Sequence, residues 1–386
     1  MTLAADSVSR LIPVARPYLG QEEEAAVVDA LRSGWITQGP RVAEFEQQFS
    51  QYIGCPHAIA VSSCTTALHL ALLACGIQPG DEVICPSLSF IATANSIRYV
   101  GATPIFVDVD RETFNLDPNQ VAASITSRTK AILVVHQVGL PADMDTLMQV
   151  AGEFGLPVIE DAACAIGSTY HGALVGGPIG TMACFSFHPR KILTTGEGGM
   201  ITVRDMKLAE RLRRLRQHSM SLSDVARHSA TTITHETYDE VGYNFRMTDM
   251  QAAIGLVQLN RLGGFLRKRR LFASRYDEAL RSIAWLQTPV VPANCEHNYQ
   301  SYMVRMLKGS SARRDAIMQE LLVQGISTRR AIMAIHREAP YQAFARDEDL
   351  PNTAEATDSG LILPLYHQMT EAEQDHVIDA LHRVRL

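Results

Sequence analysis

The chain has 386 residues, 46% of them hydrophobic and 20% charged, which is enough apolar sequence for one large domain and a smaller one. Its 35 basic and 41 acidic side chains give a formal net charge of −6, which argues against nucleic acid or an anionic membrane as the main partner. No segment approaches the roughly 20 uninterrupted apolar residues of a membrane span. Residues 1–16 lack the apolar core of a secretory signal, so we expect a cytoplasmic protein.

Two amphipathic helices are predicted first, at Gln21 to Ser33 and Val42 to Tyr52. From about residue 55 to residue 205, short apolar runs alternate with helix-like segments. This alternation predicts an α/β fold with a mostly parallel seven-stranded sheet that is covered by helices on both faces. The expected strands are His57 to Val61, Val83 to Cys85, Pro104 to Val109, Ala131 to Val135, Pro157 to Ile159, Ala183 to Phe187 and Met200 to Val203.

A long helical pattern follows from Thr248 to Arg281, with an expected interruption at Gly263-Gly264. Beyond Trp285 the pattern changes to an alternating strand at Tyr299 to Leu307 and a helix at Ser311 to Gln324, which predicts a separate α+β domain. We therefore divide the chain into an N-terminal arm (1–16), a large domain (17–270) and a small domain (271–386).

The seven cysteines form no C-x-x-C pair, and most stand in apolar runs. This pattern is typical of buried free thiols in a reducing compartment. We expect no metal site from their spacing.

The most informative stretch runs from Ser186 to Lys191 and continues into the glycine-rich turn at residues 196–199. A lysine amine can condense with an aldehyde, and pyridoxal phosphate (PLP) is the cofactor that presents one. The phosphate of that cofactor needs hydroxyl and backbone donors, and Ser186 is placed to supply a hydroxyl. The stretch predicts a PLP lysine at position 191.

Asp161 ends the apolar run that starts at Val158, and ligands of parallel sheets bind beyond such strand ends. An aspartate facing the pyridine nitrogen of PLP would keep that nitrogen protonated. The alternative is a helix N-cap aspartate, which on this residue alone is the more common situation.

Ser62-Ser63-Cys64-Thr65-Thr66 lies between the first sheet strand and a helix, where free amides and the helix dipole suit a phosphate. Simple capping by serine or threonine explains the segment equally well. A dinucleotide site is disfavoured, because no G-x-G-x-x-G follows the strand. Phe90 follows the next strand, where it could stack on a flat ring or pack in the core.

With these motifs, the chain resembles the DegT/DnrJ/EryC1/StrS family, the sugar aminotransferases among the fold-type I PLP enzymes. The resemblance runs from Arg16 to the C-terminus. It is carried by Ser62 to Leu70, Gly80 through Asn95, Glu160 to Ala163, Ser186 to Met200 and Gly242 through Gly255.

The resemblance implies a role for several individual residues. Lys191 would form an aldimine with PLP and move the proton, Asp161 would pair with the pyridine nitrogen, and Phe90 would stack on the ring. Thr65, the Cys64 backbone and Ser186 would hold the phosphate. Asn244 would reach the phosphate of the neighbouring subunit, which implies a homodimer with shared sites. Many members have glutamine where this chain has Cys164; a thiol is a weaker donor to the cofactor.

The implied reaction moves an amino group from L-glutamate, through pyridoxamine phosphate, to a nucleotide-linked keto-deoxy sugar, at C4 or else at C3. The residues expected near substrate are Trp35, Thr37, His188, Arg329 and His336. A keto-cyclitol aminotransferase and a non-catalytic regulator with the same fold stay open as alternatives. The related sugar dehydratases have histidine in place of the lysine, so Lys191 argues against that activity.

Overall fold

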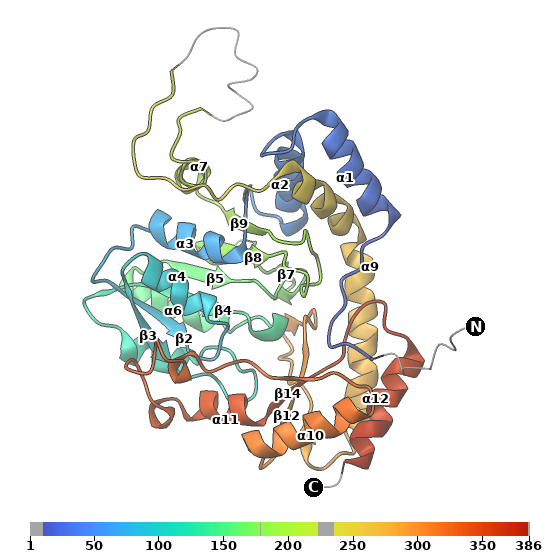
Figure 1. Ribbon diagram of the computed structural model, residues 1–386. Helices are drawn as coiled ribbons and strands as arrows, with labels where there is room; N and C mark the ends of the chain where they lie inside the picture. The colour runs from blue at the N-terminus through green and yellow to red at the C-terminus, as the bar shows by residue number, and fades with distance from the viewer. Residues whose placement is uncertain (1–10, 178, 223–234, 385–386) are drawn as a thin grey trace.

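The computed structural model describes residues 11–177, 179–222 and 235–384, so most of the expected N-terminal arm lies outside the described residues. A seven-stranded sheet forms the centre of the large domain (Figure 1). All its strands run in one direction except β9, which is antiparallel to both of its neighbours. The predicted α/β fold is confirmed. Across the sheet the strands are β1 (His57–Val61), β9 (Gly199–Val203), β8 (Met182–Ser186), β5 (Val158–Asp161), β4 (Thr129–Val135), β2 (Glu82–Pro86) and β3 (Thr103–Val107).

The sheet is buried on both faces because alternate residues of each strand point to opposite sides. In β4, Leu133 packs toward α3 and α7, whereas Ile132 and Val134 pack toward α6. At the β1 and β8 side, α2 and α9 cover this second face. The helices of the large domain are α1 (Gln21–Ser33), α2 (Pro40–Ile53), α3 (Cys64–Ala74), α4 (Ala92–Tyr99), α5 (Pro118–Val121), α6 (Met144–Phe154) and α7 (Met206–Leu215).

One long helix, α9 (Asp249–Leu280), connects the two domains along the side of the molecule (Figure 1). The expected interruption at Gly263-Gly264 was wrong, because the helix runs unbroken for 32 residues. Each glycine disfavours a helix by about 1 kcal/mol. The flanking Leu262 and Phe265 are buried against the large domain, and this packing outweighs the propensity. Within the described residues, no helix is both long and apolar enough to cross a membrane.

The packing of α9 changes along its length. Residues up to Leu266 join the core beside the sheet, and those from Phe272 onward join the core of the small domain. The small-domain core also receives Ile12 of the N-terminal arm, which pairs with Ile326. The expected boundary at 270/271 therefore falls inside a helix that belongs to both cores.

The small domain is built on a four-stranded antiparallel sheet. Its strands in spatial order are β10 (Leu286–Gln287), β12 (Tyr302–Met306), β14 (Gly360–Leu363) and β13 (Arg329–Arg330). Its helices are α10 (Ser311–Val323), α11 (Pro351–Ser359) and α12 (Glu371–Arg383). A third, small sheet joins β11 (Cys295–Glu296), β6 (Thr169–Tyr170) and β7 (Ala173–Leu174).

The seam between α9 and the small domain contains a buried histidine, His367. Its ring stacks on Phe265 with centroids 4.1 Å apart, and neither ring nitrogen has a hydrogen-bond partner among the described residues. Burial, together with Arg269 and Lys268, lowers the pKa of His367 to about 3. The folded state therefore holds this ring neutral.

We expect His367→Phe to make the protein less sensitive to acid. Below the ordinary histidine pKa, His367 binds a proton in the unfolded chain but not in the folded chain. The free energy of unfolding therefore falls as the pH drops from about 6.5 toward 3. Between pH 7 and pH 5 this single group accounts for about 2 kcal/mol of the free energy of unfolding. Urea titrations at the two pH values should show a loss smaller by about that amount in His367→Phe. The exposed His382→Phe is the control and should lose as much as wild type; an equal loss in all three proteins would contradict the prediction.

Candidate active site

The carboxyl ends of β1, β2, β5 and β8 lie at one edge of the sheet, because these strands share a direction. Each strand is followed there by a residue predicted from the sequence. Asp161 ends β5, the central strand, and Lys191 lies in the loop after the neighbouring β8. The fold thus gathers the predicted lysine, carboxylate and phosphate segment at one place.

Lys191 points its amine at the thiol of Cys164. The Nζ atom lies 3.1 Å from Cys164 Sγ. Burial lowers the pKa of the Lys191 amine, but Cys164, with further contributions from Cys64 and Asp161, raises it more, so the pKa ends above its ordinary value. The thiol of Cys164 is therefore a direct side-chain partner of the Lys191 amine.

Asp161 is buried, with 7% of its surface exposed, and is held by two donors. Thr93 donates its hydroxyl to Oδ2 at 2.9 Å, and the amide of Ala163 donates to Oδ1 at 3.2 Å. Burial raises the pKa of the Asp161 carboxyl, while these hydrogen bonds and Lys191 oppose that rise. A buried carboxylate held in this way is suited to pair with a cation, such as a protonated pyridine.

The hydroxyls of Ser89 and Thr93 form a hydrogen-bonded chain that ends at the Asp161 carboxylate. The sequence analysis missed both residues. Ser89 Oγ lies 2.7 Å from Thr93 Oγ1. Both residues stand inside the family motif that ends at Asn95. Serine and threonine are too common for their type alone to have identified them; their positions one helical turn apart are the only sequence signal.

The start of α3 supplies amides at the same edge. Ser63 caps the helix by accepting the amide of Thr66 at 3.2 Å, so the capping interpretation of this segment is correct. The amides of Cys64 and Thr65 precede the first helical hydrogen bond and are available to an anion. The Cys64 thiol points away, toward the carbonyl of Cys184 at 3.6 Å.

Gly199, the last residue of the glycine-rich turn, lets this segment approach β9. A Cβ atom at position 199 would lie 2.6 Å from the carbonyl of Ser63 and 2.7 Å from the amide of Cys64. Ser186, at the end of β8, pairs with Gly199 across the strands and is partly exposed. The turn therefore places the Ser186 hydroxyl close to the helix start.

Phe90 keeps 69% of its surface exposed, unlike the core phenylalanines. This exposure excludes the core-packing alternative for the described chain. The preceding segment is clamped by the small domain, since the amide of Ser89 donates to Met333 at 3.2 Å and that of Ile335 donates to Ser87 at 2.8 Å. An aromatic face is thus presented from a fixed loop.

His336 has a different position from the one expected near substrate. Its ring is 2% exposed and lies between the Ser87 hydroxyl and the Asp347 carboxylate, each 2.8 Å from a ring nitrogen. These contacts join the small domain to the segment that carries Phe90. The ring is therefore enclosed in the domain interface and has no open surface for a sugar.

Arg190, Arg329 and Arg330 form one cationic group, because the charges of the other two act on Arg329. Burial and the neighbouring Arg190 and Arg330 lower the pKa of the Arg329 guanidinium. All three side chains are exposed, and Arg190 directly precedes Lys191 in the chain. The sequence analysis named Arg329 but missed Arg190. His188, two residues before Arg190, is partly buried, and burial lowers its pKa, so its ring is neutral at pH 7.

The remaining predicted residues, Trp35, Thr37 and Asn244, lie in loops of the large domain. Trp35 packs against Gly39 in the loop before α2, and the carbonyl of Thr37 accepts the amide of Asp249 at the start of α9. Asn244 is exposed, and the next amino acid, Phe245, bonds the amide of Ser62 at 2.8 Å.

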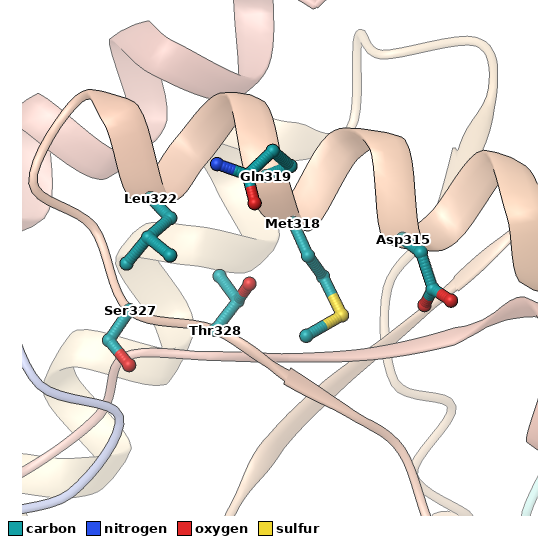
Figure 2. Close-up of a pocket in the computed structure, with 6 residues that line it drawn as sticks. All are labelled: Asp315, Met318, Gln319, Leu322, Ser327 and Thr328. Carbon is teal, nitrogen blue, oxygen red and sulfur yellow. The ribbon is translucent and has the colours of Figure 1, made fainter.

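A shallow hollow on the small domain is a separate feature (Figure 2). It lies between α10 and the segment that leads into β13. No lining residue is a lysine, histidine or arginine, so the hollow lacks an amine that would hold the cofactor. Its lining residues are Asp315, Met318, Gln319, Leu322, Ser327 and Thr328.

Comparison with known proteins agrees with this geometry. The family model of the DegT/DnrJ/EryC1/StrS aminotransferase family matches residues 17–382. The chain belongs to this family. It is 44% identical to the GDP-perosamine synthase of Caulobacter vibrioides over 375 residues, which cover 97% of the chain and 98% of that protein. It is 40% identical to the spore coat polysaccharide biosynthesis protein SpsC of Bacillus subtilis over 380 residues, 97% of each.

The fold comparison leads to the same family. The PLP form of Spr1654 from Streptococcus pneumoniae superposes with a TM-score of 0.89 at 30% identity, covering 96% of this chain and 97% of that one. The DegT/DnrJ/EryC1/StrS chain described here is therefore a PLP-dependent aminotransferase with the fold-type I architecture. Its amine, buried carboxylate, exposed aromatic face and helix amides are the groups that PLP needs, so the residues present fit the cofactor.

Proposed function

We propose that this aminotransferase moves an amino group from L-glutamate to a nucleotide-linked keto-deoxy sugar, at C4 in preference to C3. The observation that carries the proposal is the exposed cationic group of Arg190, Arg329 and Arg330, in which Arg190 directly precedes Lys191 in the chain. Guanidinium groups suit the diphosphate of a sugar nucleotide and the carboxylates of glutamate. The 44% identical relative, a GDP-perosamine synthase, is named for a product of this substrate class and supports the proposal.

Each residue at the sheet edge has a proposed task. When bound, PLP supplies an electron sink and a carrier for the amino group. Lys191 would hold the cofactor covalently, and its amine would move the proton at the reacting carbon. Asp161 pairs with the pyridine nitrogen and Phe90 covers the ring. The Cys64 and Thr65 amides with the Ser186 hydroxyl bind the phosphate.

We further propose a homodimer in which Asn244 reaches the phosphate of the partner subunit's site. The exposure of Asn244 supports this role. So does the exposure of Phe90, which lies at the carboxyl ends of the strands. A mixed dimer tests the geometry: Asn244→Ala in one subunit should weaken phosphate binding in the other subunit. Damage confined to the mutated chain's own site would overturn the shared arrangement.

A half-reaction screen tests the substrate. Enzyme loaded with glutamate should lose the absorption of the lysine-bound cofactor and recover it only when a suitable keto acceptor is added. Recovery with nucleotide-linked keto-sugars supports the proposal, and analysis of the product by NMR distinguishes C4 from C3. Recovery with keto-cyclitols alone would overturn the proposal in favour of an aminocyclitol enzyme, and no change with glutamate would favour a non-catalytic regulator.

Arg329→Ala tests the role of the cationic group in binding the nucleotide sugar. We expect it to raise the KM for the nucleotide sugar by about tenfold or more, because a charge-assisted contact to phosphate is lost. The Arg313→Ala variant, in the first turn of α10, is the control and should keep the wild-type KM. Steady-state kinetics at two salt concentrations measure the effect, which should shrink at high salt. An unchanged KM in Arg329→Ala would separate this arginine from substrate binding.

A further inference from the structure

The loop at residues 297–300, which leads into the small domain, reaches the backbone on both sides of Lys191. Gln300 is 8% exposed, and its side chain accepts the amide of Ile192 at 2.9 Å. The same side chain donates to the carbonyl of Arg190 at 2.7 Å. One buried amide group therefore bridges the peptide groups that flank the lysine.

Asn298 holds the opposite side of the contact between Lys191 and Cys164. It is fully buried, and its side-chain nitrogen donates to the carbonyls of Cys164 and Ile166 at 2.8 Å each. Its side-chain oxygen accepts the backbone N–H of Gln300, also at 2.8 Å. Two linked residues thus fix both chain segments whose side chains meet at the 3.1 Å contact between Nζ and Sγ.

The surroundings hold this loop in one unusual conformation. Tyr299, between the two amide residues, has a positive φ of 52°, which a non-glycine residue adopts only where neighbours enforce it. The buried Arg269 of α9 donates to the carbonyls of Tyr299 and Gln300 at 2.9 and 2.8 Å. Gly139 makes room on the other side, because a Cβ atom there would lie 1.9 Å from the oxygen of Asn298.

We propose that Gln300 is a positioning residue for Lys191: by bracing the peptide groups before and after the lysine, it directs the amine toward Cys164 and Asp161. A lysine side chain has many rotamers, and a displacement of about 1 Å at a reacting group can slow a reaction by about a hundredfold. Fixing the backbone on both sides limits where the amine can lie. The inference rests on the proposed role of Lys191 but concerns geometry that exists without the cofactor.

The contact between Lys191 and Cys164 gives a direct probe. o-Phthalaldehyde condenses with an adjacent amine and thiol to a fluorescent isoindole, with the release of two water molecules. In cofactor-free protein, the Lys191–Cys164 product should form and be located by peptide mass spectrometry, and Cys164→Ala should abolish it. Gln300→Leu, which removes both hydrogen bonds, should slow its formation by about tenfold to a hundredfold.

A milder variant guards against misfolding. Gln300→Glu retains an acceptor for the amide of Ile192 but loses the donor to Arg190, so its rate should lie between those of wild type and Gln300→Leu. If Gln300→Leu does not fold, Gln300→Glu decides the question by the same comparison with wild type.

Gln374→Leu separates positioning from general stability. Gln374 is a fully buried amide that donates to Phe272 at 2.6 Å and accepts from Arg275 at 2.8 Å, within the small-domain region. This variant should lower the thermal midpoint as Gln300→Leu does, yet form the isoindole at the wild-type rate. A wild-type rate in Gln300→Leu, or an equally slow rate in Gln374→Leu, would overturn the proposal.

The proposed function can fail independently. Borohydride treatment of wild-type holoenzyme should fix the cofactor on Lys191, as measured by intact mass. If it does not, the proposed role of Lys191 fails, while the isoindole rates still decide whether Gln300 orients this amine.

Discussion

Lys191→Ala should lower kcat by about 10³-fold or more, because it removes both the covalent attachment of the cofactor and the group that moves the proton. The Cys64 and Thr65 amides, Ser186 and Asp161 remain, so the cofactor should still bind without a covalent bond. Borohydride treatment followed by intact-mass measurement should then find the cofactor fixed to wild type and absent from the variant. Partial rescue of turnover by a small primary amine is expected, since such an amine can replace the missing base.

The control for this experiment is Lys130→Ala. Lys130 is exposed on β4 and bonds the carbonyl of Ser127, away from the sheet edge. It should keep wild-type turnover and covalent cofactor. Undiminished turnover in Lys191→Ala would remove this lysine from its proposed role and leave the amine of another residue to be found.

The fold could be predicted from the sequence because its parallel strands are buried on both faces. Each of the seven strands appears as a short apolar run, and the order of runs and helices leaves little choice of architecture. The prediction failed where local propensity and long-range packing disagree. Gly263-Gly264 favours a helix end, but the burial of Leu262 and Phe265 keeps α9 continuous.

The lysine and carboxylate of the candidate site could also be predicted, because they are chemically unusual residues at the ends of strands. The residues that support them through hydrogen bonds could not be predicted. Thr93, Asn298 and Gln300 act through hydrogen bonds, and Gln300 meets the Lys191 loop from 108 positions away in the sequence. Polar residues of these types are common in loops and helix turns, so only the three-dimensional arrangement gives them a role.

The position of His336 differs from the one expected from the sequence. The resemblance to the family implied that His336 lies near substrate. The structure encloses its ring between Ser87 and Asp347, because an imidazole with two nitrogens can join two polar groups across a domain interface. Burial, which is set by packing across the two domains, decided between these roles.

Asp161→Asn should lower kcat by about 10²- to 10³-fold, the size of effect seen when one preorganised electrostatic partner is removed from a reacting centre. Asparagine keeps the shape of the side chain and an oxygen for the Thr93 hydroxyl, but it has no charge to keep the pyridine nitrogen protonated. Thr93→Val, which removes one hydrogen bond and leaves the charge, should slow turnover by only about tenfold. Single-turnover rates with glutamate measure both effects at the chemical step.

The same substitution has two opposing effects on the stability of the fold. Burial raises the pKa of the Asp161 carboxyl, which means that the folded chain without cofactor disfavours the charged form. Replacing the carboxylate with a neutral amide of equal size removes this penalty but loses the hydrogen bond from the amide of Ala163, so the thermal midpoint of cofactor-free Asp161→Asn should stay close to that of wild type. Activity is thus expected to fall without a matching loss of stability. A variant that loses activity only because it unfolds would contradict this account, and so would one that keeps wild-type kcat.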